Sequence, residues 1–295
     1  MRFSLTQIER ARPLLGTTVS MRVHGLSESD ANRAIDEAFG EIALVHRLMS
    51  FQQAESDVSR LNREAAVRTQ DVHPATFEVL YWAREIAEAS VGCFDITVAD
   101  KLVEWGMLPA PDSRHPPDPQ ADWRDIELGE DYGVRFRRPL WIDLSGIAKG
   151  YAVDRAIERL QRHGAVQACV NAGGDLRIYG PHAEAIALRH EKPASEGIPV
   201  LEIENAAVAS SGGDIERRGH EGEMAGPHVD GRDGRAIPMG RFASVVAESC
   251  LIADALTKPV LILQEASGAL LRRFGASAHL CDATCGWRHL ASPET

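Results

Sequence analysis

One glycine-rich turn constrains the fold of this chain more than any other feature. The stretch DLSGIAKGYAVDRA begins at Asp143, follows an apolar run and leads into residues with helical spacing. Gly146 and Gly150 allow backbone N–H groups to approach an anion closely, and a helix N-terminus adds a favourable dipole. The stretch therefore predicts an extended segment, a tight turn and a helix, and a phosphate is the first candidate for a ligand.

Two well-known phosphate-binding loops do not match this turn. A Walker A loop needs four residues between its glycines and then Lys followed by Ser or Thr, whereas Lys149 is followed by Gly150 and Tyr151. The dinucleotide pattern Gly-x-Gly-x-x-Gly is absent from the chain. The turn is therefore neither a nucleoside-triphosphate loop nor a Rossmann loop, and alone it leaves the ligand open.

The distribution of helical and β-rich segments predicts the fold class. Apolar residues recur at helical spacing from Ser29 to Met49, from Pro74 onwards, after the glycine-rich turn, and from Cys250 to Leu263. Short β-rich runs bounded by Gly, Pro, Asn or Asp cluster in the second half of the chain. Strands that cluster between a few long helices predict an α+β fold, with mixed sheets packed against those helices.

A proline-rich stretch, 109–122, interrupts the chain. Its prolines sustain neither a helix nor a central strand, so the stretch is either a surface loop or a connection between two lobes. We expect a single domain over residues 1–295.

Charge and hydropathy exclude several classes of protein. The net charge of −11 argues against a general nucleic-acid binder. No apolar run reaches the roughly 18 residues of a membrane span, so we expect no integral membrane segment. The N-terminus lacks the apolar region and cleavage site of a signal peptide, which predicts a cytoplasmic protein. Five cysteines, an odd number, indicate reduced thiols rather than a disulfide framework.

Several polar and glycine-rich turns at the ends of these elements occur in a telling order. From about Leu15 to Leu263 the chain resembles the ApbE family of FAD:protein FMN transferases. The resemblance is carried by eight segments: LLGTT, MSFQQAESDVSRLN, GCFDITVADKLVEWG, DLSGIAKGYAVD, NAGGDLRIYG, SSGGD, HVDGRDGR and LIADALTK. It implies a Mg²⁺-dependent enzyme that binds FAD, cleaves its pyrophosphate, joins FMN to a Thr or Ser hydroxyl of a target flavoprotein, and releases AMP.

The resemblance also implies a set of metal ligands. Mg²⁺ prefers hard oxygen ligands. Asp254 matches the family's carboxylate ligand, and the backbone carbonyl of Ala148 matches its partner. The family usually has a Thr or Ser four residues after that aspartate, but this chain has Lys258 there. Thr257, one residue earlier, shares the same helix face, so we expect it to supply the third ligand.

The remaining site residues are likewise implied by the resemblance. His228 matches the family's histidine, and its imidazole suits removal of a proton from the acceptor hydroxyl. The segment around it is one residue shorter than usual, with Gly231 in place of a proline. Lys149 either neutralises the pyrophosphate or is solvated, and it stays outside the predicted catalytic set. The predicted FAD contacts are Leu15, Phe51, Phe94, Asp95, Ser145, Tyr151 and Val229.

Two other functions remain open from the sequence. With water in place of the protein hydroxyl, the same residues would give an FAD pyrophosphatase that produces FMN and AMP. A non-catalytic FAD-binding protein is the second alternative, and the lysine at position 258 favours it.

Overall fold

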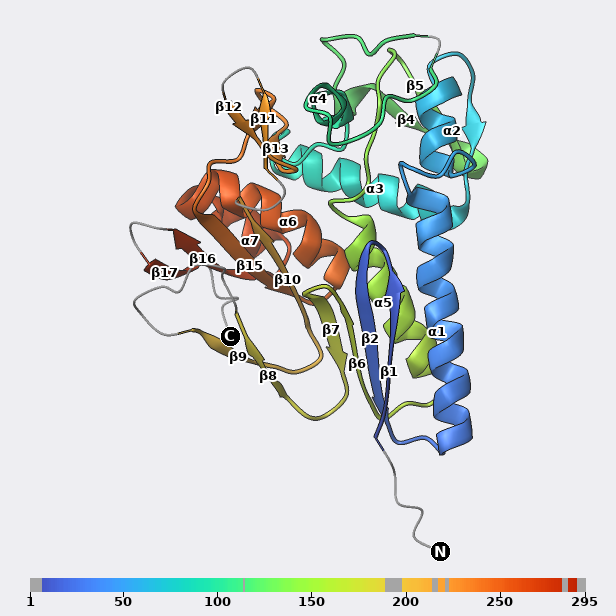
Figure 1. The fold of residues 1–295 in the computed structure, drawn as a ribbon, viewed down its shortest axis with the longest axis vertical. Coiled ribbons are helices and arrows are strands. Elements are labelled where there is room, and N and C mark those ends of the chain that lie inside the picture. Colours follow the sequence, from blue (N-terminus) through green and yellow to red (C-terminus); the bar gives the residue numbers. More distant parts are fainter. Residues whose placement is uncertain are drawn as a thin grey trace, which may run out of the picture.

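An eight-stranded sheet is the largest element of the protein (Figure 1). The computed structural model describes residues 7–113, 115–188, 198–213, 217–220, 223–282 and 286–290. In spatial order the strands are β1 (Ile8–Leu14), β2 (Thr17–His24), β6 (Gln167–Ala172), β7 (Asp175–Tyr179), β10 (Ala207–Gly212), β15 (Arg241–Ala247), β16 (Ser277–Asp282) and β17 (Gly286–Leu290). All neighbours pair antiparallel, so the α+β class is confirmed but this sheet is not of mixed sense.

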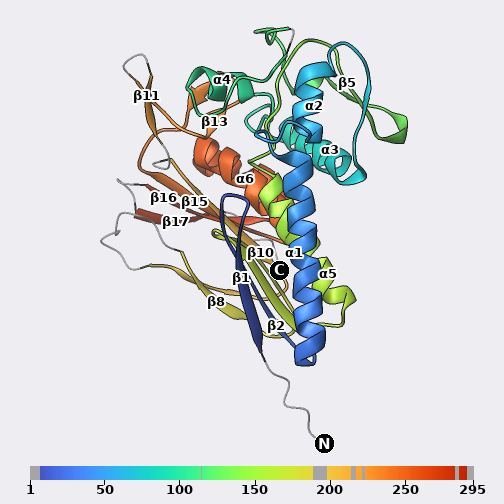
Figure 2. The same ribbon diagram turned by 45° about the vertical axis from the view of Figure 1, so that its right-hand side comes forward.

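Three long helices cover one face of this sheet (Figure 2). They are α1 (Glu28–Met49), α5 (Ala148–Arg162) and α6 (Cys250–Leu263), and the short α7 (Gly268–Arg273) follows α6. Each long helix begins within a few residues of its predicted start. Alternate residues of β2 (Val19, Met21 and Val23) are fully buried beneath the helices, which gives this strand the period of two expected for a sheet with one buried face.

A second group of elements lies above the sheet in Figure 1. It contains α2 (Asp57–Glu64), α3 (Pro74–Ala89), α4 (Ala99–Glu104), and a small sheet in the order β3 (Gln70–Asp71), β5 (Gly133–Phe136), β4 (Ile126–Leu128). The short 3-10 helices η1 (Trp123–Asp125) and η2 (Glu130–Tyr132) flank β4. The described residues of the proline-rich stretch, 109–113 and 115–122, lie between α4 and η1 in this group. One hydrophobic core contains residues of both groups, among them Leu61 of α2 and Val245 of β15.

Among the described residues, three short two-stranded pairs complete the fold. The pair β8 (Glu184–Ala187) and β9 (Val200–Ile203) lies against the other face of the large sheet, over a small second core. The pairs β11 (Arg218–His220) with β12 (Glu223–Ala225) and β13 (Val229–Asp230) with β14 (Arg235–Ala236) lie above α6 in Figure 1. Among the described residues, no helix has the length and apolarity needed to cross a bilayer.

Candidate active site

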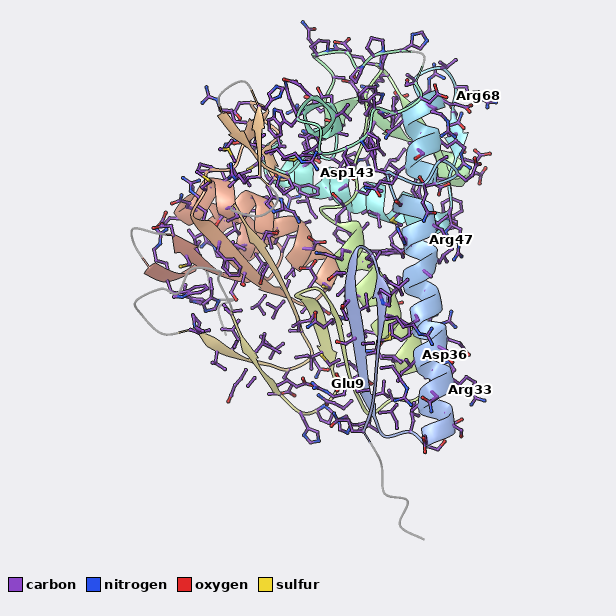
Figure 3. All side chains as sticks on the ribbon, viewed as in Figure 1. Glu9, Arg33, Asp36, Arg47, Arg68 and Asp143 are labelled. Carbon is purple, nitrogen blue, oxygen red and sulfur yellow. The ribbon has the colours of Figure 1, made fainter. Side chains whose placement is uncertain are left out.

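Two adjoining hollows lie where the upper group meets α5 and α6. Their volumes are about 130 and 350 Å³, and both are lined by Asp143, Ser145 and Lys149 of the glycine-rich turn. Figure 3 labels Asp143 at this junction. The smaller hollow takes in the predicted residues Phe94, Asp95, Ser145, His228, Val229 and Asp254; the larger one takes in Leu15, Phe51, Ser145 and Ala148.

A third hollow, of about 830 Å³, lies elsewhere, on the face of the sheet opposite the long helices. It is lined by Glu9, which Figure 3 labels far from Asp143, and by residues of β2 and β6. None of the predicted site residues lines it, so the chemistry suggested by the sequence belongs to the two smaller hollows.

Gly150 sets the distance between α5 and α6. A Cβ atom at this position would lie 2.2 Å from the carbonyl oxygen of Cys250 and 2.9 Å from the Cβ of Asp254. Only glycine therefore permits this approach of the two helices. The Gly150 N–H donates to Asp254 Oδ2 at 3.1 Å, which gives a first-turn N–H of α5 a partner outside its own helix.

The second carboxylate oxygen of Asp254 holds the side chain of Lys258, one turn further along α6. Lys258 Nζ lies 2.5 Å from Asp254 Oδ1, 2.9 Å from the Asp254 carbonyl oxygen and 2.9 Å from the Gly146 carbonyl oxygen. All three donors of the ammonium thus have acceptors. Burial alone would raise the pKa of Asp254, but the Lys258 and Lys149 ammoniums together lower it below its usual value.

A second ion pair lies beside the first. Lys149 Nζ is 2.7 Å from Asp175 Oδ2, at the start of β7. Burial and the nearby charge of Asp254 raise the pKa of Asp175 to about 6, against the opposing effect of Lys149. Each of the two lysine ammoniums that line the smaller hollow thus pairs with a buried carboxyl group.

His228 also lines the smaller hollow and lies directly before β13. Its carbonyl oxygen accepts from the Ile237 N–H at 3.0 Å, which fixes the backbone at this point. Burial lowers the pKa of His228 to about 3, and the positive charges of Lys258 and Lys149 contribute in the same direction. The imidazole is therefore neutral near pH 7, and in the free protein it is a weak base.

Gly231 explains how the loop after His228 reaches the wall of the hollow. A Cβ at this position would lie 2.4 Å from both the Cβ of Asp95 and the carbonyl oxygen of Gly92, and the Gly231 N–H donates to the Cys93 carbonyl oxygen at 3.3 Å. A proline here would lack that donor. The contact holds the His228 loop against the segment that carries Asp95, whose pKa burial raises to about 6.

The 350 Å³ hollow, the larger of the two that Ser145 lines, is bordered by the turn between β1 and β2. Leu15 has φ 53° and Gly16 has φ 70°, as in a two-residue hairpin turn whose two central residues both adopt the left-handed conformation. Left-handed backbone is unfavourable for leucine. The side chain of Leu15 packs at the edge of the core and lines the hollow together with Phe51.

Two predicted residues line neither hollow. Tyr151 is buried and its hydroxyl donates to Glu78 Oε2 on α3 at 2.7 Å. Thr257 is fully buried, donates to the Asp254 carbonyl oxygen at 2.7 Å and pairs with Ser211 Oγ at 2.9 Å. The hollows and their ion pairs also involve residues outside the predicted set: Asp143, Lys149, Asp175, Ser211 and Lys258. For Asp175 the only signal in the sequence is its place after two glycines.

Comparisons with known proteins show the family of the chain. The model of the ApbE family matches residues 15–280. An FAD:protein FMN transferase of Vibrio cholerae is 28% identical over 283 residues, covering 89% of this chain and 83% of its own length; one of Haemophilus influenzae is 28% identical over 276 residues, covering 85% and 79%.

Solved structures share the fold. The ApbE protein of Thermotoga maritima superposes with a TM-score of 0.83 at 23% identity, and 97% of each chain is covered. The flavin transferase ApbE of Vibrio cholerae superposes with a TM-score of 0.81 at 23% identity, covering 98% of this chain and 97% of its own.

Proposed function

The chain belongs to the ApbE family, and we propose that it is an FAD:protein FMN transferase. The observation that carries this proposal is that a neutral His228 and two lysine ammoniums line the same small hollow. Such a site meets the main demands of phosphoryl transfer, which are a proton acceptor for the nucleophile and positive charge at the transferred group.

The proposed reaction assigns each bond change. The hydroxyl oxygen of a Thr or Ser in the acceptor protein bonds to the phosphorus of the FMN moiety. The bond from this phosphorus to the bridging oxygen breaks, and AMP leaves with the electron pair. His228 takes the hydroxyl proton. The negative charge of a bound diphosphate opposes the effect of the lysines on the imidazole, so FAD binding makes His228 a stronger base than it is in the free protein.

The FAD contacts that we propose are the predicted residues that line the two hollows. Phe94, Asp95 and Val229 line the smaller one, Leu15 and Phe51 line the larger one, and Ser145 lines both. A dinucleotide that spans both hollows would place its pyrophosphate beside the turn they share, where Lys149 lies. Tyr151 takes no part in this proposal.

The residues around Asp254 do not fit magnesium, the cofactor that the resemblance implies. Mg²⁺ needs nearly octahedral oxygen ligands at 2.0–2.1 Å. Lys258 Nζ already occupies the position next to Asp254 Oδ1, and Thr257 lies outside the hollow. A divalent ion about 3 Å from this ammonium would meet about 11 kcal/mol of repulsion at an effective dielectric constant of about 20. We therefore assign no step to a metal.

The first test is a flavinylation assay. The purified protein is incubated with FAD and a flavin-stripped lysate of its own source, and Thr or Ser peptides heavier by one FMN are sought by mass spectrometry. We expect such peptides with the wild type, and their loss in His228→Ala with FAD binding retained. His182→Ala, an exposed histidine on the far side of the sheet, is the matched control and should remain active.

The same assay separates the alternatives. AMP release without labelled peptides would indicate a pyrophosphatase. Bound FAD without AMP or labelled peptides would indicate a non-catalytic binding protein, the candidate favoured by the lysine at the expected metal position. Full activity of His228→Ala would refute the role of this histidine.

A further inference from the structure

Lys258 occupies an oxygen cage of the kind that holds a cation. Two of the three acceptors are backbone carbonyls, of Gly146 and Asp254, and the third is the Asp254 carboxylate. The cage joins the glycine-rich turn to α6, two segments that are 112 positions apart at this contact. The ammonium thus links the same two segments from which the family resemblance draws its metal ligands.

The turn is shaped around the lysine stem. A Cβ atom on Gly146 would lie 3.2 Å from Lys258 Cε and 3.5 Å from its Nζ, so glycine at this position makes room for the side chain. Lys258 is itself 9% exposed, and it lines the smaller hollow with His228. A buried lysine with all three donors satisfied is held in one conformation, unlike a solvated surface lysine.

We propose that Lys258 serves as the built-in cation of this site in place of a divalent metal, so that flavin transfer by this chain needs no metal. This inference rests on the proposed function. Lys258 supplies one positive charge beside the diphosphate, and Lys149 supplies a second from the turn. Together they match the two charges of a magnesium ion, and their negative partners Asp254 and Asp175 are already in place.

Across the described parts of the chain, no group of three or more His, Cys, Asp or Glu side chains is arranged to hold a metal ion. The ammonium of Lys258 fills the place beside the Asp254 carboxylate.

The decisive variant is Lys258→Thr, with Lys101→Thr as its matched control. The threonine would place a hydroxyl four residues after Asp254 and remove the ammonium. Lys101 is a partly exposed lysine on α4 whose ion pair with Glu104 lies outside both hollows. Transfer and AMP release are measured after EDTA treatment, with and without added Mg²⁺.

We expect EDTA to change the wild-type rate, and that of Lys101→Thr, by less than about twofold. Lys258→Thr should lose activity by about tenfold or more in EDTA and recover it with Mg²⁺. An EDTA-treated wild type that is inactive and regains activity with Mg²⁺ would overturn the proposal.

A binding measurement separates this inference from the proposed function. Mg²⁺ or Mn²⁺ should leave the melting temperature of the wild type unchanged and raise that of Lys258→Thr, because only a bound ion stabilises the folded state. FAD affinity, followed by flavin fluorescence, should be insensitive to EDTA in the wild type and in Lys101→Thr, and sensitive to it in Lys258→Thr. If neither the wild type nor the variants transfer FMN, the proposed function is refuted. Lys258 as the cation of the site is tested separately, because Mn²⁺ binding at this site in the wild type would refute it whether or not FMN is transferred.

Discussion

Replacing Gly150 by alanine tests the packing on which the site depends. The added Cβ would lie 2.2 Å from a backbone carbonyl oxygen, and no flexible side chain can move aside to make room for it. Overpacking of this kind costs about 1–3 kcal/mol. Separation of the helices would also weaken the hydrogen bond from the Gly150 N–H to Asp254, since such bonds to charged groups contribute about 1.5–3 kcal/mol.

The helix propensity of alanine opposes these two effects. Alanine is about 1 kcal/mol better than glycine inside a helix. The expected net loss in the free energy of unfolding is therefore about 3 kcal/mol, a large share of the 5–15 kcal/mol that holds an ordinary domain folded. The gain in helix propensity is smaller than the loss from the clash, because the added Cβ meets the backbone carbonyl group of Cys250, which cannot move aside as a flexible side chain would.

Gly40→Ala is the matched control for this change. Gly40 also lies in a helix, α1, but nothing lies within 4 Å of the Cβ that would be added. We expect a gain of about 0.5–1 kcal/mol there. Urea denaturation followed by tryptophan fluorescence measures both variants. If Gly150→Ala were as stable as Gly40→Ala, the close packing of α5 on α6 would not hold as described.

Two further predictions concern the walls of the hollows. The imidazole of His228 should stay neutral throughout pH 5–8 in the free protein, because its pKa is lowered to about 3. Removal of a positive charge in Lys258→Met should raise that pKa. An NMR titration that gives an ordinary pKa near 6.5 in the wild type would contradict this prediction. Leu15→Gly should relieve the backbone strain at φ 53° and change the free energy of unfolding by less than about 1 kcal/mol. Its FAD affinity, measured by flavin fluorescence, should fall because an apolar contact is lost. An unchanged FAD affinity would show that Leu15 does not contact the flavin.

The helices were predictable from the sequence because their signals are local. Residues from Cys250 to Leu263 form α6 within the bounds that the apolar spacing predicts, and Ser249 caps the helix by accepting from the Ile252 N–H at 3.3 Å. The α1 helix likewise begins next to its expected start, with Ser27 as its cap. Periodicity and capping involve neighbours three or four positions apart, which a sequence displays directly.

The orientation of site residues depends on partners that a sequence does not display. Ser145 and Tyr151 flank the same turn, yet only Ser145 lines the hollows, because the hydroxyl of Tyr151 meets Glu78, 73 positions away. The sequence likewise shows a lysine where the family has a hydroxyl. It does not show that this lysine folds back onto Asp254 and reaches the Gly146 carbonyl oxygen.

The glycines of the turn have a different role from the one that their sequence first indicates. The Gly150 N–H donates to the carboxylate of Asp254 and is therefore not directed at a ligand. The absence of a Cβ at Gly150 allows the carbonyl group of Cys250 to approach closely. The carbonyl oxygen of Gly146 accepts from Lys258 Nζ, and the absence of a Cβ at Gly146 leaves room for the lysine side chain. A single carboxylate, that of Asp254, therefore secures both ends of the turn, one directly and one through an ammonium. The positive charge for an anionic ligand then comes from lysine side chains that the glycines allow to pack closely, and less from the backbone of the turn.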